Sequence, residues 1–215
     1  KGADIKKGVK QVLDTVYRNV GQTCSCLSRA VVVEEIYDQV VEEFKKQYEN
    51  YPAGDPREES TVVGPLSSRK QFERVQKYVN IGLDEGANLL KGEAIEKNGS
   101  GYFVKPVIFT DVKPGMTIHD EEIFGPVLSI IKVKDKNEAI EVANAVEYGL
   151  SSAVFGEDDE ALEVAREIRA GECYVNGGAK GPNLPFGGYK QSGVGREGGI
   201  HGLLEYYELK SVYKQ

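Results

Sequence analysis

Residues 127–176 have the sequence VLSIIKVKDKNEAIEVANAVEYGLSSAVFGEDDEALEVAREIRAGECYVN. Three runs of β-forming residues predict strands: Val127–Val133, Leu150–Phe155 and Cys173–Asn176. The first two are near-continuous apolar runs, which are typical of strands buried on both faces. The segments between the strands, Lys136–Val146 and Glu157–Arg169, have the residue spacing of helices. Because strand–helix–strand units of this kind connect through right-handed crossovers, the stretch predicts a parallel sheet.

The flanking sequence extends the same pattern. Amphipathic spacing predicts three upstream helices: Asp4–Tyr17, Glu34–Tyr48 and Ser67–Glu85. Further strands are expected at Arg29–Val33, Ala87–Leu90 and Glu205–Tyr213. Pro106 interrupts the β-forming run Tyr102–Thr110, which favours an edge strand or two short pieces there. The prediction is an α/β protein with a mostly parallel sheet and helices on both faces.

Composition excludes several classes of function. The 215 residues carry a net charge of −7 and no basic run, so a nucleic acid or an anionic membrane is a poor partner. No apolar segment is long enough to span a bilayer. The 3 cysteines do not suggest a disulfide framework, which favours a reducing, cytoplasmic setting. The chain starts without methionine and leads almost at once into a helix, so we expect a fragment of a longer protein.

The first candidate site is the short turn Asn19–Cys26 (NVGQTCSC), between a predicted helix and a predicted strand. Cys24 on this turn is a candidate nucleophile, although a free cysteine is more often an inert buried residue. A nucleophilic thiol usually needs a base, and the only histidines are His119 and His201. Their contexts favour solvated surface positions, but a papain-like cysteine hydrolase remains open. Cys24 and Cys26 lack the spacing of a zinc site, and we expect no metal.

Two later stretches could bind a ligand. In Glu121–Pro126 (EEIFGP), a carboxylate could accept hydrogen bonds from ribose hydroxyls, and the ring could pack on a flat heterocycle. In Pro185–Glu197 (PFGGYKQSGVGRE), dense glycines let the backbone approach a ligand; Phe186 could line a pocket and Glu197 could move protons. The alternatives are a solvated acidic turn and a surface loop. No Gly-x-Gly-x-x-Gly follows a strand and opens a helix, and there is no Walker-type loop.

Together, the three stretches resemble the aldehyde dehydrogenase superfamily. The matching residues are Gly21-Gln22-x-Cys24, Glu122–Pro126 and Pro185–Glu197, in the order that the family has. Two segments between them also resemble the family: Gly101–Pro106 (GYFVKP) and Tyr148–Leu150 (YGL). The resemblance covers essentially the whole chain, and three motifs in register are far more specific than one. It implies the catalytic α/β domain of that family.

The resemblance implies a role for each motif residue. Cys24 would attack an aldehyde to give a thiohemiacetal, and its backbone N–H would form half of an oxyanion hole. Hydride transfer to NAD or NADP would leave a thioester that water hydrolyses to the carboxylic acid. Glu122 would hold the nicotinamide ribose, with Phe124 beside the nicotinamide. Phe186 would line the aldehyde pocket, and Glu197 would relay protons.

In the resembling family, the general-base glutamate, the oxyanion-hole asparagine and the cofactor domain lie upstream of the catalytic cysteine. We therefore expect residues 1–204 to be an isolated catalytic domain and residues 205–215 a C-terminal oligomerisation strand. The fragment alone is expected to be inactive, and the parent to be a homodimer or homotetramer. A cysteine hydrolase and a non-catalytic assembly module remain as alternatives. The sequence names neither the aldehyde nor the choice between NAD and NADP.

Overall fold

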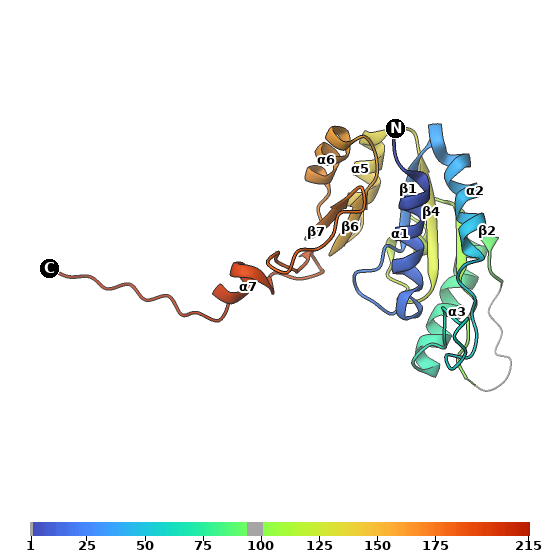
Figure 1. The fold of residues 1–215 in the computed structure, drawn as a ribbon, viewed down its shortest axis with the longest axis horizontal. Helices are drawn as coiled ribbons and strands as arrows, with labels where there is room; N and C mark the ends of the chain where they lie inside the picture. Colours follow the sequence, from blue (N-terminus) through green and yellow to red (C-terminus); the bar gives the residue numbers. More distant parts are fainter. Residues whose placement is uncertain (1, 94–100) are drawn as a thin grey trace.

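The computed structural model describes residues 2–93 and 101–215. Its main sheet has the strand order β1-β4-β3-β2, formed by β1 (Arg29–Val33), β4 (Val127–Val133), β3 (Val107–Val112) and β2 (Asn88–Lys91). β4 pairs in parallel with β1 and with β3, and only β2 is antiparallel. A separate parallel pair, β6 (Ser151–Val154) with β7 (Glu172–Val175), lies beside β1 (Figure 1).

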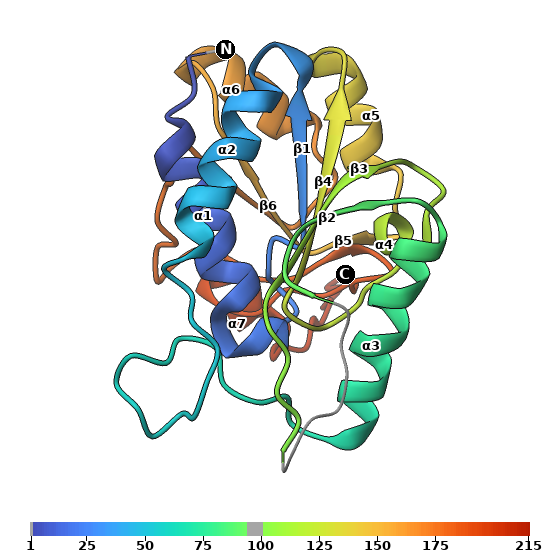
Figure 2. The same ribbon diagram turned by 90° about the vertical axis from the view of Figure 1, so that its right-hand side faces the viewer.

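Helices cover both faces of the sheet (Figure 2). The helices α1 (Ile5–Tyr17) and α2 (Tyr37–Tyr48) lie on one face, and α3 (Arg69–Asp84) and α5 (Lys136–Asn144) lie on the other. The helix α6 (Asp158–Glu167) packs on β6 and β7. This arrangement confirms the predicted α/β class with a mostly parallel sheet. The shorter elements are η1 (Arg18–Gly21), η2 (Glu34–Ile36), α4 (Thr117–Asp120), β5 (Tyr148–Gly149), β8 (Tyr189–Lys190) and α7 (Gly199–Leu204).

Side-chain caps fix where three of the long helices begin. Asp4 accepts a hydrogen bond from the Lys7 N–H at 3.1 Å, and Ser68 accepts one from the Gln71 N–H at 3.2 Å. Asp135 accepts from the first turn of α5 in the same way. Each cap satisfies a backbone donor that the helix itself leaves unpaired, and a cap of this kind contributes about 1 kcal/mol.

The core lies around β3 and β4. Ile108, Phe109, Leu128 and Ile130 have no exposed surface. The edge-strand alternative for the run around Pro106 is therefore wrong, because β3 lies between β4 and β2 inside the sheet. The alternative of two short pieces is confirmed, because Phe103 makes an isolated bridge with Pro65 and β3 begins only after Pro106. The proline comes directly before the first strand residue, Val107, where its missing N–H costs no ladder hydrogen bond.

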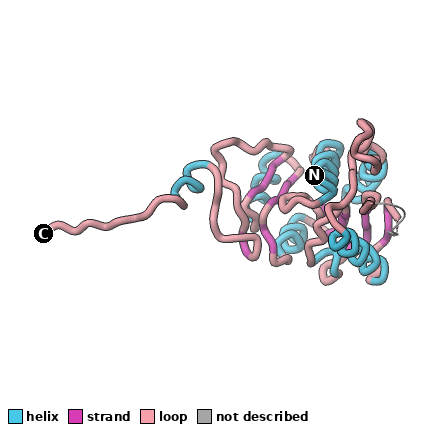
Figure 3. The backbone as a smooth tube through the Cα atoms, turned by 90° about the horizontal axis from the view of Figure 1, so that it is seen from below, coloured by secondary structure: helices cyan, strands magenta, loops and turns pink. Residues whose placement is uncertain are grey.

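The structure corrects two other predictions. β6 is half-buried rather than buried on both faces, because β6 and β7 form a separate pair and do not continue the parallel sheet of β4. Residues 205–215 form no strand in this single chain; they extend away from the body (Figure 3), where their backbone meets no sheet edge to pair with. Tyr206, Leu209 and Tyr213 are 89%, 98% and 93% exposed. Among the described residues, no helix is both long and apolar enough to cross a membrane.

Candidate active site

Cys24 lies exposed on the turn between η1 and β1. Three consecutive residues before it, Asn19, Val20 and Gly21, have φ values of 49°, 60° and 71°. A β-branched residue such as Val20 rarely adopts a positive φ, and such strain, of order 1–3 kcal/mol, concentrates at functional sites. Side chain–backbone hydrogen bonds hold the turn: Asn19 Nδ2 donates to Gln22 O at 2.9 Å, and Gln22 Nε2 donates to Asn19 O at 3.1 Å.

Gly21 joins this turn to the EEIFGP segment. A Cβ atom at Gly21 would lie 2.1 Å from the carbonyl oxygen of Gly125, so no other residue fits without moving the backbone. The side chain of Gln22 also accepts a hydrogen bond from the Ser67 N–H at 3.0 Å. The thiol turn is therefore fixed against two other loops.

The helix α3 positions the segment from Glu122 to Phe124. Gln71 Nε2 donates to the carbonyls of Ile123 and Phe124, at 3.3 and 2.6 Å. Arg74 donates to the carbonyls of Ile123 and Glu122. Phe124 is itself held at a φ of 60°. These contacts occupy the backbone carbonyls and leave the Glu122 side chain exposed.

A cavity of about 610 Å³ brings three of the predicted site residues together. Cys24, Glu122 and Phe124 all line it. Gln191 and Ser192 of the glycine-rich loop line it as well, and Ser192 Oγ accepts a hydrogen bond from the Gly149 N–H at 3.0 Å. The cavity also continues between β1 and β6.

The three thiols have different surroundings. Burial, with a smaller contribution from the charge of Glu122, raises the pKa of Cys26 to about 11. The Cys26 thiol also donates to Gly21 O, with Sγ 3.8 Å from the oxygen. Burial raises the pKa of Cys173 in β7 too. Cys24 is the exposed thiol of the three, and it faces the cavity.

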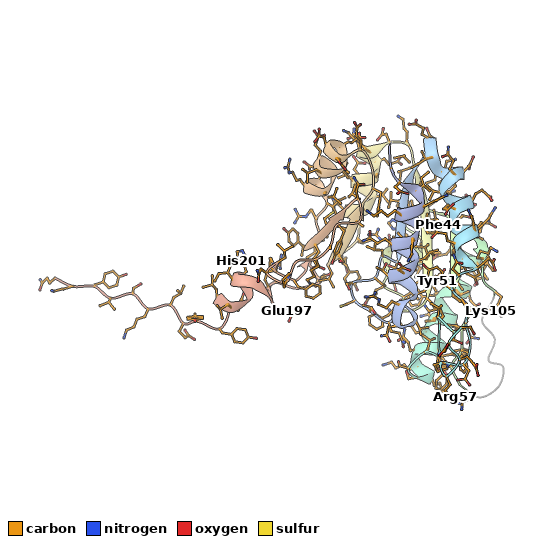
Figure 4. All side chains as sticks on the ribbon, in the orientation of Figure 1. Phe44, Tyr51, Arg57, Lys105, Glu197 and His201 are labelled. Carbon is orange, nitrogen blue, oxygen red and sulfur yellow. The ribbon has the colours of Figure 1, made fainter. Side chains whose placement is uncertain are left out.

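Phe186 and Glu197 lie elsewhere. They do not line the cavity, and they pair with each other through two backbone N–H···O bonds of 2.7 Å. The Phe186 ring lies under the Lys180 ammonium, 4.1 Å from the ring centroid. Glu197 is exposed near α7, away from the main sheet (Figure 4). The structure thus separates these two predicted residues from Cys24.

Both histidines were expected at solvated surface positions, and the structure contradicts this for His119. His119, on α4, is 1% exposed rather than solvated, and its Nδ1 lies 2.5 Å from Asp120 Oδ1. It lines the same cavity as Cys24. His201 is exposed on α7 (Figure 4), as expected. Within residues 2–93 and 101–215, no group of three or more His, Cys, Asp or Glu side chains could hold a metal ion.

Gln71 and Arg74 were not predicted as parts of the site. Gln191 and Ser192 lie in the predicted stretch Pro185–Glu197, but neither was given a role of its own. Gln71 and Arg74 lie on a helix whose sequence signals only amphipathic packing. Gln71 and Arg74 donate to backbone carbonyls, which every residue has, so the sequence of Glu122–Phe124 does not reveal these contacts.

Comparison with known proteins decides the family. A sequence profile described as the aldehyde dehydrogenase family matches residues 1–212. This chain belongs to the aldehyde dehydrogenase family. Proteins from several strains of Staphylococcus aureus, MSSA476 and MW2 among them, are 47% identical to it. The alignment covers 97% of this chain and 45% of each of those proteins.

Solved structures of family members share the fold. The NAD-dependent aldehyde dehydrogenase from Sinorhizobium meliloti matches with a TM-score of 0.91 and 41% identity, over 97% of this chain and 42% of that one. The C291A mutant of aldehyde dehydrogenase C from Pseudomonas syringae, solved with NAD+ and octanal, matches with a TM-score of 0.90 and 40% identity, over 96% and 43%. The chain therefore spans less than half the length of the family members it matches.

Proposed function

We propose that this chain carries the catalytic thiol of an NAD(P)-dependent aldehyde dehydrogenase, with Cys24 as the nucleophile. The observation that supports the proposal is that the exposed Cys24 thiol shares one cavity with Glu122 and Phe124. The strained, glycine-packed turn fixes the thiol relative to both residues. Such pre-organisation is what a reacting group needs.

The donor set fits a nicotinamide cofactor. Glu122 offers an exposed carboxylate, an acceptor for two ribose hydroxyls, while Phe124 offers a half-buried ring beside it. When bound, NAD or NADP supplies the hydride acceptor. Glu122 would orient the ribose, and Phe124 would limit water around the reacting carbon. The relatives named above for NAD support this assignment for the family.

Cys24 would add through its sulfur to the aldehyde carbonyl carbon, forming a thiohemiacetal. Its own backbone N–H would donate to the developing oxyanion. Loss of hydride from that adduct leaves a thioester on Cys24, and water then releases the carboxylic acid and the thiol. Phe186 is proposed to contact the aldehyde, and Glu197 is proposed to move protons. Neither lines the cavity in the single chain, so Glu197 would act through water or a partner group.

The 215-residue chain by itself should not catalyse aldehyde oxidation. In the family it resembles, the upstream half supplies the general base and the cofactor domain. Loss of a general base alone costs about 10²–10⁴ in rate. The test is NADH or NADPH formation from octanal by this 215-residue chain and by the full gene product, each against its Cys24→Ala variant. Activity only in the full product, and only with Cys24, is expected; activity in the Cys24→Ala variant would refute the proposal.

A cysteine hydrolase is a second candidate, because His119 lines the cavity of Cys24 and its Nε2 has no hydrogen-bond partner among the described residues. The His119→Gln variant of the full product separates the two functions. The dehydrogenase proposal expects unchanged Cys24 alkylation and unchanged aldehyde oxidation. A hydrolase would lose thiol reactivity in that variant and would cleave an activated ester without NAD. If Cys24 resists alkylation altogether, a non-catalytic assembly module is favoured instead.

A further inference from the structure

Two adjacent carboxylates border the cavity that contains Cys24. They belong to Glu121 and Glu122, and both residues are exposed. In the proposed function, Glu122 binds the cofactor ribose and Glu121 has no role. Because the two side chains have the same chemistry and similar exposure, a third group must decide which carboxylate is presented to a ligand.

Tyr78 of α3 distinguishes the two carboxylates. Its hydroxyl donates to Glu121 Oε2, with 2.5 Å between the two oxygens. A hydrogen bond to a carboxylate is stronger than one between neutral groups. The Tyr78 side chain is only 6% exposed, so the packing of α3 holds the ring in place. The Glu121 carboxylate is therefore bound to a fixed donor.

The protonation of Tyr78 supports this contact. Burial and, second, the hydrogen bond to Glu121 raise the pKa of Tyr78 above its ordinary value. The hydroxyl therefore stays protonated at neutral pH and can donate to the ionised carboxylate.

The backbone at Glu121 separates the two side chains. Glu121 follows α4, and its N–H donates to Thr117 O at 3.0 Å. Its φ of −107° and ψ of 151° are those of extended chain, in which consecutive side chains point to opposite sides. With the Glu121 side chain directed at Tyr78, the Glu122 side chain is turned away from α3.

Arg74 fixes the same contact from the preceding turn of α3. Its guanidinium donates to the carbonyls of Glu122 and Ile123. Its Cζ also lies 4.9 Å from the centroid of the Tyr78 ring, within the range of a cation–π interaction. One side chain thus contacts both the ring of Tyr78 and the backbone of Glu122, which fixes the two relative to each other.

We propose that Tyr78 and Glu121 are positioning residues of the cofactor site: the Tyr78 hydroxyl binds the Glu121 carboxylate, so that Glu122 is the carboxylate presented to the ribose of NAD or NADP. This inference rests on the proposed function, because it takes Glu122 as the group that binds the ribose. Tyr78 does not itself line the cavity, and it acts on the cofactor only through the two glutamates.

The chain offers a matched control for the loss of the Tyr78 hydroxyl. Tyr51 is 8% exposed, and its hydroxyl donates to Asp14 Oδ1 at 2.7 Å. Tyr51→Phe therefore also breaks a hydrogen bond from a buried tyrosine to a carboxylate. Neither Tyr51 nor Asp14 lines the cavity, so this variant reports the structural cost of such a change without touching the site.

Kinetics of the full gene product test the positioning role. In Tyr78→Phe, the KM for NAD should rise about three- to tenfold, since the lost bond involves a charged group. The KM for octanal and the rate of Cys24 alkylation should stay unchanged. Glu121→Gln keeps an acceptor for the hydroxyl and should raise the KM for NAD less. An unchanged KM for NAD in Tyr78→Phe, or an equal rise in Tyr51→Phe, would overturn the inference.

Carboxyl footprinting gives a readout that does not depend on turnover. A carbodiimide with glycine ethyl ester labels accessible carboxylates, and mass spectrometry resolves the labels at Glu121 and Glu122. In the full gene product, NAD should protect Glu122 and not Glu121, and Tyr78→Phe should raise the labelling of Glu121 severalfold. Protection of Glu121 instead, or labelling of Glu121 that ignores Tyr78→Phe, would overturn this inference alone. Protection of neither carboxylate by NAD would refute the proposed role of Glu122, and this inference with it.

Discussion

The three cysteines are expected to react in a definite order. Cys24 is exposed, whereas burial raises the pKa of Cys26 to about 11 and also raises that of Cys173. Iodoacetamide at pH 8 should label Cys24 first, because only the thiolate reacts. Labelling of Cys26 should increase about tenfold for each pH unit up to about pH 11, since its thiolate fraction does so below its pKa.

Mass mapping with fragmentation between positions 24 and 26 measures this order, under reducing conditions so that the two neighbouring thiols do not oxidise. Faster labelling of Cys173 than of Cys24 would contradict the assignment of Cys24 as the accessible nucleophile.

Gly21 should be the least replaceable glycine of the site. In Gly21→Ala, the new methyl group would meet the Gly125 carbonyl at 2.1 Å, at a φ of +71°. Gly86→Ala is the matched control, because its φ is +89° and nothing lies within 4 Å of the added Cβ. The control should lose about 1 kcal/mol of unfolding free energy from backbone strain alone.

Gly21→Ala should lose about 2 kcal/mol more, because overpacking forces backbone shifts. Urea unfolding of both variants gives the difference. If the two variants are equally stable, the close contact between the Cys24 turn and Gly125 does not constrain the site.

Among the helices, α3 has a role beyond packing. Gln71 donates to two carbonyls of the segment that carries Glu122 and Phe124. Gln71→Ala should cost about 1–2 kcal/mol of stability. In the full gene product it should raise the KM for the cofactor while leaving the Cys24 alkylation rate unchanged, with Lys77→Ala on the exposed side of the same helix as the control. An unchanged KM, or an equal effect of the control, would show that α3 does not position the cofactor residues.

The elements also show what sequence reasoning could reach. Periodicity predicted α1 and β4 nearly to the residue, because an amphipathic stripe and an apolar run are local properties. It failed to show that β6 and β7 form a sheet separate from that of β4, and it failed for the residues after Glu205. Pairing depends on which edges meet in space, and a strand forms only where an edge is available.

For the candidate site too, local features could be predicted from the sequence and long-range placement could not. Cys24, Glu122 and Phe124 line one cavity, and each lies on a turn that nearby backbone fixes. Their roles in catalysis remain a proposal. Phe186 and Glu197 lie on the segment beyond β7, and nothing local to them specifies a position beside Cys24. The burial of His119 was not predicted either, because the residues that follow it, Asp120–Glu122, are all acidic and favour a solvated turn.

At the scale of the whole molecule, the exposed tail is proposed to be an assembly element. Tyr206, Leu209, Val212 and Tyr213 are 80–98% exposed on an extended segment. Extended apolar chain of this kind tends to pair with a sheet edge, and in a symmetric oligomer the contact is reciprocal. Deleting residues 206–215 from the full gene product should convert a dimer or tetramer to smaller species in light scattering. Retention of the full assembly size would show that the tail lies outside the interface.

The most direct measurement of the central claim is the acylation of Cys24 during turnover. The full gene product is mixed with octanal and NAD, quenched in acid, digested and analysed by mass spectrometry. The expected result is an octanoyl group on Cys24, present only when NAD is added and absent in Cys24→Ala. Turnover without any acyl group on Cys24, or an acyl group on Cys26 or Cys173 instead, would contradict the account.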